Sequence, residues 1–129
     1  MEIKLSDNIN AHRRLCIKKD LIELSQWINT LLGINTEIDY LKKIESNLIK
    51  DNNISTEIQS LRRKNTLLVG TLCKYEKELN IEYQYGKNEY NVIRAKEHEK
   101  KRTVHSIFII EFTQLKKRIY HKISTYELR

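Results

Sequence analysis

The sequence predicts an all-α protein, built as an elongated antiparallel helical hairpin or coiled coil and extended by a third long amphipathic helix. First, apolar residues between positions 58 and 79 recur at alternating spacings of three and four, which is the heptad pattern of packed helices. Second, the 129 residues include no proline and only three glycines, so few residues would break a helix. Third, Asp51-Asn52-Asn53 separates two periodic runs, as in a short turn between antiparallel helices. The length suits one helical domain.

The first part of the chain is expected to form a short helix at about 7–19 and a longer arm at about 21–50. Asp20 is followed three residues later by Glu23, which fits a capping box with Asp in the place of Ser or Thr. We therefore favour a kink or a new helix start near Asp20. One helix running through from about Asp7 is the alternative.

The second arm, at about 56–85, is expected to fold back on the first. If the turn is centred near residue 53, residues at equal distances from it face each other across the hairpin. This register pairs Leu72 with Ile34 and Leu79 with Ile28, so apolar positions meet apolar positions along both arms.

Three residues of the hairpin have two interpretations each. Asn65 lies at a core position of the heptad pattern, where it either fixes the register of the helices or lies at the margin and binds water. Gly33 and Gly70 fall near each other in the expected register. They either allow a close approach of the two backbones or lie together by chance.

A third long helix is expected at about 89–126. Gly86 either ends the second arm in a left-handed cap or lies inside a continuous helix. Apolar residues of the third helix form a stripe at the helical period, and the hairpin offers only a narrow second face to cover it. We therefore expect a homo-oligomer or an obligate protein partner. The candidate partner surface consists of Val104, Phe108, Phe112, Leu115 and Ile119.

The net charge of +7 is concentrated in the last third of the chain, where residues 87–129 hold eleven Lys or Arg against five Asp or Glu. A solvated helical face explains this excess. Binding of nucleic acid through its phosphates and contact with an acidic protein are the alternatives. The candidate anion or nucleic-acid patch consists of Lys87, Arg94, Lys100, Lys101, Arg102, Lys116, Lys117 and Arg118.

No residue pattern predicts catalysis, a cofactor or a metal site. His98-Glu99 begins like a zinc-binding H-E-x-x-H motif, but Arg102 stands at the second histidine position. His98 and His105 lie two helical turns apart, which is about 10 Å and too far for one metal ion. We therefore expect a protein that is not an enzyme.

Cys16 and Cys73 form no C-x-x-C pair and are interpreted as reduced thiols. The sequence has no N-terminal signal pattern and no apolar run of membrane-spanning length, so we expect a soluble, cytoplasmic protein. The predicted function is a non-enzymatic coiled-coil interaction or scaffolding module. The alternative is a basic helical protein that binds nucleic acid non-specifically through its C-terminal third.

Overall fold

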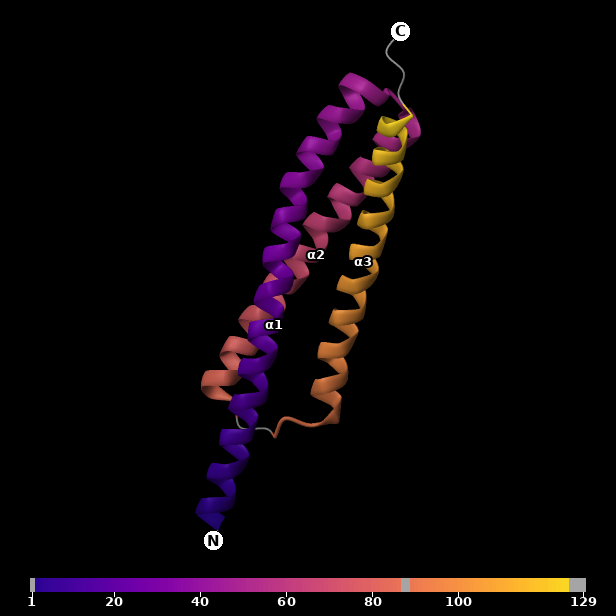
Figure 1. Ribbon diagram of the computed structural model, residues 1–129. Coiled ribbons are helices and arrows are strands. Elements are labelled where there is room, and N and C mark those ends of the chain that lie inside the picture. Colours follow the sequence, from indigo (N-terminus) through magenta and orange to yellow (C-terminus); the bar gives the residue numbers. More distant parts are fainter. Residues whose placement is uncertain (1, 87–88, 126–129) are drawn as a thin grey trace.

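The computed structural model describes the backbone of residues 2–86 and 89–125, and the side chains from residue 7 onward in these ranges. Three long helices account for nearly all of it: α1 at Glu2–Ile44, α2 at Asn52–Tyr85 and α3 at Val92–Ser124. A single π-helical turn, η1 at Glu45–Ile49, continues α1. The helices run up, down and up, so that α2 is antiparallel to both neighbours (Figure 1). The predicted all-α class is confirmed, and the described residues contain no strand.

The expected new helix start near Asp20 is wrong, because α1 is one helix from Glu2 to Ile44. The separate helix at 7–19 and the arm at 21–50 up to Ile44 are therefore parts of one helix, and η1 and Lys50 complete the arm. Asp20 lies in the middle of this helix and is 7% exposed. Its carboxylate contacts other helices rather than capping a new one, and no proline or glycine nearby interrupts the backbone hydrogen bonds.

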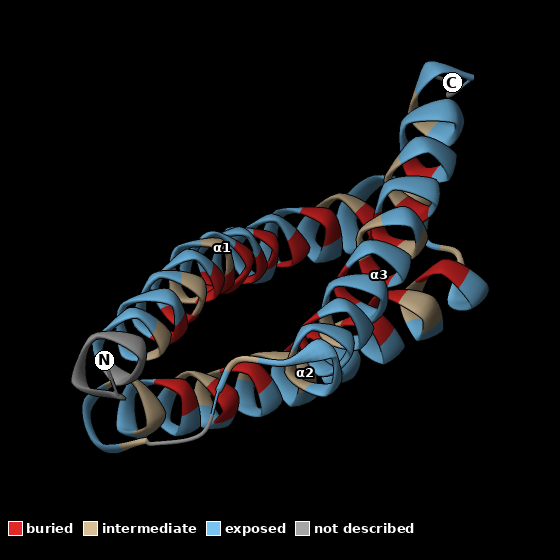
Figure 2. Ribbon diagram, turned by 90° about the horizontal axis from the view of Figure 1, so that it is seen from below, coloured by how far each residue is buried: buried red, intermediate tan, exposed pale blue. Residues whose placement is uncertain are grey.

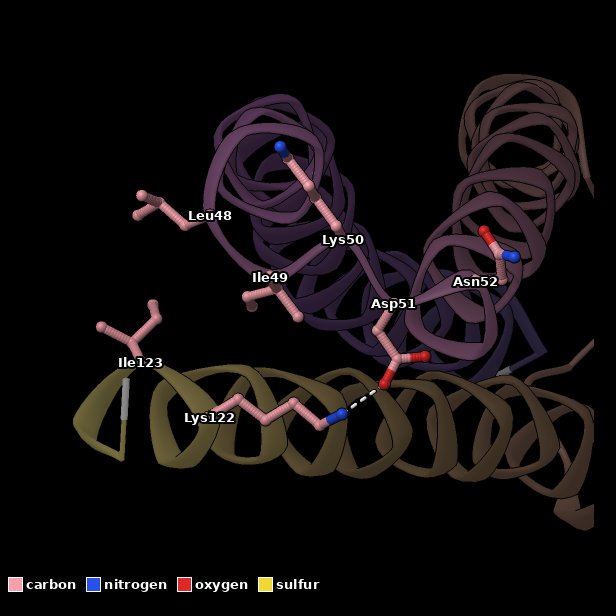
Figure 3. Close-up of a pocket in the computed structure, with 7 residues that line it drawn as sticks. All are labelled: Leu48, Ile49, Lys50, Asp51, Asn52, Lys122 and Ile123. Carbon is pink, nitrogen blue, oxygen red and sulfur yellow. Dashed lines mark hydrogen bonds and ion pairs between the residues drawn. The ribbon is translucent and has the colours of Figure 1, made fainter. Parts of the chain in front are cut away.

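The turn of the hairpin consists of Lys50 and Asp51, which lie at the corner drawn in Figure 3. Lys50 has a left-handed backbone with φ 51°, and its N–H donates to the carbonyl of Glu45 at 2.7 Å. The Asp51 carboxylate accepts hydrogen bonds from the N–H groups of Asn53 and Ile54 at 2.9 and 3.4 Å, which makes it the N-cap of α2. As a result α2 begins at Asn52, four residues before the predicted start.

Two contacts between α1 and α2 define the register of the hairpin. The Asn65 side-chain amide donates to the carbonyl of Leu31 at 3.1 Å, and the Arg13 guanidinium donates to the carbonyl of Glu82. The contacts are separated by 17 residues on α2 (82 minus 65) and by 18 on α1 (31 minus 13). Asn65 is buried, so the interpretation in which it lies at the margin with water is wrong.

The expected residue pairs across the hairpin are also wrong. In the observed register Leu72 is level with Leu24, about ten residues away from its predicted partner Ile34. Leu79 is displaced from Ile28 in the same direction. The turn comes earlier than expected, at Lys50 and Asp51, which moves the facing positions on α1 towards its N-terminus and accounts for about half of this displacement.

The core lies between the three helices, whose buried residues are on the faces turned towards one another (Figure 2). Helix α3 contacts α1, α2 and η1, and its apolar stripe is buried in this core. Four of the five predicted partner-surface residues, Phe108, Phe112, Leu115 and Ile119, are therefore core residues, and only Val104 is exposed. Their assignment to a partner surface is wrong because the hairpin covers them in the same chain.

The glycines have ordinary local roles. Gly33 and Gly70 are exposed, and an added Cβ would meet nothing within 4 Å at either residue, so they do not mark a close approach of backbones. Gly86 follows the end of α2 with extended φ and ψ of −67° and 147°, which is not the left-handed cap. Helix α3 then starts after Asn91, whose side chain accepts a hydrogen bond from the N–H of Arg94. None of the described helices is both long and apolar enough to cross a bilayer.

Candidate functional site

A buried polar cluster lies where α1, α2 and α3 meet. It consists of Asp20 and Glu23 from α1, Tyr75 from α2, Tyr90 from the segment before α3, and His98 and Arg102 from α3. We call this set the His98 cluster. The spacings Asp20–Glu23 and His98–Arg102 are three and four residues, which places each pair on one face of its helix.

His98 is the centre of the cluster and is 2% exposed. Its Nδ1 atom lies 2.8 Å from the hydroxyl of Tyr75. Its Nε2 atom lies 2.7 Å from Oε1 of Glu23 and 3.5 Å from Oδ1 of Asp20. The imidazole therefore contacts one group from α2 on one side and two carboxylates from α1 on the other.

The two carboxylates differ in their partners. Arg102 binds Glu23 with two N–H groups, at 3.0 Å to Oε2 and 2.6 Å to Oε1. These hydrogen bonds hold the pKa of Glu23 below its ordinary value, with a smaller contribution from His98 in the same direction. Asp20 instead accepts a hydrogen bond at Oδ2 from the hydroxyl of Tyr90, and no described residue donates a hydrogen bond to its Oδ1.

The two tyrosines stay protonated and can serve as hydrogen-bond donors. Burial raises the pKa of the Tyr75 hydroxyl, and the nearby charge of Asp20 raises it further. Burial also raises the pKa of Tyr90, together with its hydrogen bond to Asp20. Removing either proton would place a phenolate beside existing negative charge in a poorly solvated site.

Trp27 separates the cluster from a second buried histidine. Its indole stacks on His98 with ring centroids 5.0 Å apart and on His105 with centroids 5.6 Å apart. The two histidines are thus on opposite sides of one ring, in agreement with the prediction that they cannot share a metal ion. The Nδ1 atom of His105 is buried without a partner among the described residues, and burial lowers the pKa of this imidazole.

The sequence interpretation missed this cluster because it searched for metal ligands within one helix. Asp20, Glu23 and His98 each offer a ligand atom, and these atoms lie within 4.8 Å of one another. The acidic residues precede His98 by more than 70 positions in the chain. Their spacing of three on a helix was visible in the sequence, but the register that brings them to His98 was not.

The predicted basic patch is largely paired with acidic residues of the same chain. Arg94 pairs with Glu82 and Glu97, Arg102 with Glu23, Lys116 with Glu37, and Arg118 with Glu57. Lys101 lies over the ring of Tyr75 at 4.3 Å, whereas Lys100 and Lys117 are exposed. Lys87 is outside the described residues. The patch is therefore not one continuous stripe of free cations.

A second candidate site is a partly apolar face on the outer side of α2 and α3, of which the sequence interpretation had named only Val104 and Lys100 as candidate site residues. Each helix has a stripe of solvent-facing residues at alternating spacings of four and three, and we call the two stripes together the outer α2–α3 face. They are Leu67, Thr71, Lys74, Glu78, Ile81 and Tyr85 on α2, and Ile93, Glu97, Lys100, Val104, Ile107 and Glu111 on α3. The pattern was present in the sequence, but only the burial of the opposite stripes shows which residues face solvent.

Two hollows lie along the outer α2–α3 face. One, of about 420 Å³, is lined mainly by apolar side chains that include Leu67, Val104 and Ile107. These three residues are 66%, 52% and 52% exposed. The other, of about 770 Å³, includes Ile81 and Ile93 and lies near the start of α3.

A third hollow, of about 470 Å³, lies at the turn of the hairpin (Figure 3). Its apolar lining comes from Leu48, Ile49 and Ile123. An ion pair between Lys122 and Asp51 joins α3 to the turn. The hydrogen bond from Lys122 is the main reason that the pKa of Asp51 lies below its ordinary value. The two opposite charges compensate each other, so this hollow offers no unpaired charge from these two residues to a ligand.

Comparison of the chain with protein-family models, with curated proteins and with solved structures finds no match.

Proposed function

We propose that this protein is a non-enzymatic interaction or scaffolding module that assembles through helix packing, and that its partner is a second copy of the same chain bound over the outer α2–α3 face. The observation that carries the proposal is the cluster of exposed apolar residues on two adjacent helices around the hollow lined by Leu67, Val104 and Ile107. Exposed apolar patches are typical of protein interaction sites.

The geometry of the face supports a helical partner. Each complete stripe follows alternating spacings of four and three, as in helices that pack against another helix. Its apolar members are Leu67, Ile81 and Tyr85 on α2 and Ile93, Val104 and Ile107 on α3. The hollow between Leu67, Val104 and Ile107 would receive a large apolar side chain from such a helix. A two-fold arrangement would place the same residues of each copy against the hollow of the other.

The charge of the face favours a second copy over a strongly charged partner. Four basic and five acidic residues lie on the face or line its two hollows, so their charges nearly cancel, whereas the whole chain carries +7. Two copies can therefore approach on this face without strong like-charge repulsion. These residues are Lys64, Lys74, Arg94, Lys100, Glu78, Glu82, Glu89, Glu97 and Glu111, of which Lys64 and Glu111 form an ion pair at 2.9 Å.

Non-specific nucleic-acid binding through the C-terminal third is the second candidate. The exposed side chains of Lys100 and Lys117 favour it. The ion pairs of Arg94, Arg102, Lys116 and Arg118 weigh against it, because each would have to be broken or shared to bind a phosphate. We therefore place self-association first.

The test is the molar mass in solution, measured by light scattering over a range of concentrations. The wild type should show a dimer that dissociates on dilution, and Ile107→Glu should be monomeric because it places a charge in the apolar interface. Leu32→Glu is the matched control, since Leu32 on α1 is 51% exposed and Ile107 is 52% exposed. A wild type that is monomeric at every concentration, or equal effects of the two variants, would contradict the proposal.

The same samples separate the two candidates when duplex DNA is added. Binding through phosphates would weaken steeply with salt, with a slope near 0.9 per contact, and replacing Lys117 by Gln would reduce both the affinity and the slope. Lys117 lies outside the outer α2–α3 face, so self-association by apolar packing should survive this replacement. Loss of the dimer in Lys117→Gln would argue against the apolar face as its basis.

A further inference from the structure

The His98 cluster contains a carboxylate oxygen, Oδ1 of Asp20, to which no described residue donates a hydrogen bond. Asp20 is 7% exposed. The closest donor atom is Nε2 of His98 at 3.5 Å, but that atom can carry only one proton and lies 2.7 Å from Glu23. A single N–H cannot fully serve both carboxylates, so Oδ1 of Asp20 keeps a lone pair that a bound cation could use.

A cation between these three side chains would satisfy all of them. Nε2 of His98, Oδ1 of Asp20 and a carboxylate oxygen of Glu23 offer one nitrogen and two oxygen ligands within 4.8 Å of one another. Ligand atoms of a tetrahedral site with bonds of about 2.0–2.1 Å lie about 3.3 Å apart. The distance from His98 to Asp20 already fits this value, and the distance to Glu23 would need to open by about 0.6 Å.

The remaining contacts of the three ligands have the form found around metal sites. A ligating histidine usually binds a polar group through its other ring nitrogen, and ligating carboxylates are themselves hydrogen-bonded. Here Tyr75 contacts Nδ1 of His98 and Tyr90 binds Oδ2 of Asp20. Arg102 holds the carboxylate of Glu23.

We propose that Asp20, Glu23 and His98 form a binding site for a divalent transition-metal ion of the Zn²⁺ class. The imidazole ligand favours such an ion over Mg²⁺ or Ca²⁺, which prefer an all-oxygen shell. On binding, the lone pair of Nε2 is given to the metal and the ring proton lies on Nδ1, where the oxygen of Tyr75 accepts it. The ion would join α1 to α3, and its fourth ligand would be water.

Cobalt is a suitable probe because Co²⁺ in a four-coordinate nitrogen and oxygen site absorbs visible light. The full-length protein, stripped with a chelator, should bind one Co²⁺ per chain, and Zn²⁺ should displace it. Zn²⁺ in excess should raise the melting temperature by roughly 5 °C or more, because it binds the folded chain. Asp20→Asn and Glu23→Gln should each weaken metal binding by about tenfold or more.

Two control variants make the test specific. His105→Gln changes a buried histidine on the same helix that lies beyond Trp27 and outside the cluster, so it should bind metal as the wild type does. Cys16→Ser removes the other plausible metal ligand pair, since Cys16 Sγ lies 3.6 Å from Nε2 of His12 on the surface of α1. Loss of binding in Cys16→Ser would assign the metal to that pair and overturn the proposal.

X-ray absorption of the Zn²⁺-loaded wild type makes the result independent of how well the variants fold. A first shell of nitrogen and oxygen atoms with one imidazole is expected. A sulfur ligand, a second imidazole, or no bound metal at millimolar Zn²⁺ would each overturn the assignment. An unchanged affinity for metal in folded Asp20→Asn and Glu23→Gln proteins would also overturn the assignment.

Discussion

His105 shows how one buried side chain can make stability depend on pH. Its Nδ1 atom has no partner among the described residues, and burial lowers the pKa of the imidazole. The unfolded chain therefore takes up a proton near the ordinary histidine pKa of about 6.5, whereas the folded chain takes it up only at a lower pH. Because the unfolded state binds more protons, His105 contributes stability above that pH and the contribution is lost as the pH falls.

The expected result is a smaller pH dependence in a variant without this imidazole. The free energy of unfolding of the wild type should decrease from pH 7.5 to pH 5.5. The free energy of unfolding of His105→Phe should decrease less, and this variant keeps an aromatic ring against Trp27. His121→Phe is the control because His121 is exposed on the same helix. Denaturant titrations at the two pH values measure this decrease in the free energy of unfolding for each protein. An equal decrease in all three proteins would contradict the assignment of the pH dependence to His105.

Single residues were predicted best where only helical spacing mattered. Leu72 and Leu79 were expected in the core and are buried, because their positions on the heptad pattern do not depend on the register. Asp20 and His98 could not be assigned in the same way. Their partners come from other helices, and an acidic residue in the middle of a helix is more often solvated than buried.

At the scale of the helices, replacing the three glycines by alanine should change the stability in different directions. Gly33→Ala and Gly70→Ala should each raise the stability by about 0.5–1 kcal/mol, because alanine favours the helix and meets no neighbour. Gly86→Ala should lower it, since the new Cβ would lie 2.6 Å from the backbone oxygen of Glu82. That oxygen also accepts the hydrogen bond from Arg13.

Thermal unfolding followed by circular dichroism measures these three changes. Each alanine variant is compared with the wild type under one buffer condition, and Gly33 and Gly70 control for the general effect of alanine in a helix. A melting temperature of Gly86→Ala above that of the wild type would show that the end of α2 relaxes without loss of the Arg13 contact.

The number and approximate extent of α2 and α3 were predictable, but their starts and the register were not. The absence of proline and the periodic apolar residues indicate long helices without reference to a partner. Asp51 and Asn91 cap their helices, yet several polar residues near each start could have done so. The two-residue turn at Lys50 uses a left-handed backbone at a residue that is not glycine, and no sequence rule favours that choice.

At the scale of the whole molecule, α3 should unfold together with the hairpin rather than before it. Phe112 is buried between α3 and the other helices, so Phe112→Ala should lower the free energy of unfolding by about 3–5 kcal/mol. Trp27 is the only tryptophan and lies against two residues of α3. Its fluorescence therefore reports the contact of α1 with α3, whereas circular dichroism reports all helices.

The two signals should give coincident denaturation curves in the wild type, and both should shift equally in Phe112→Ala. Lys117→Ala is the control because Lys117 is exposed on the same helix, and its curves should match those of the wild type. A fluorescence transition at lower denaturant than the loss of helix would mean that α3 separates from a hairpin that remains folded.

The third helix is where the sequence interpretation of the whole molecule failed. Its apolar stripe was correctly identified, but the hairpin was expected to offer only a narrow second face to cover it. In the structure the same stripe completes the core of one chain, and the exposed side of α2 and α3 is the surface that we propose for a partner. Periodicity shows that a face must be covered, but it does not show which helix covers it.

The up-down-up order of the helices has a mechanical consequence. The start of α1 and the end of α3 lie towards opposite ends of the bundle (Figure 1), and residues 7–44 alone span about 55 Å of helix. Tension applied between these two helix ends would act along the helix axes, so that all side-chain contacts along the core would resist the force at the same time. A two-helix hairpin pulled from its adjacent ends would instead open one turn after another, each contact bearing the force alone.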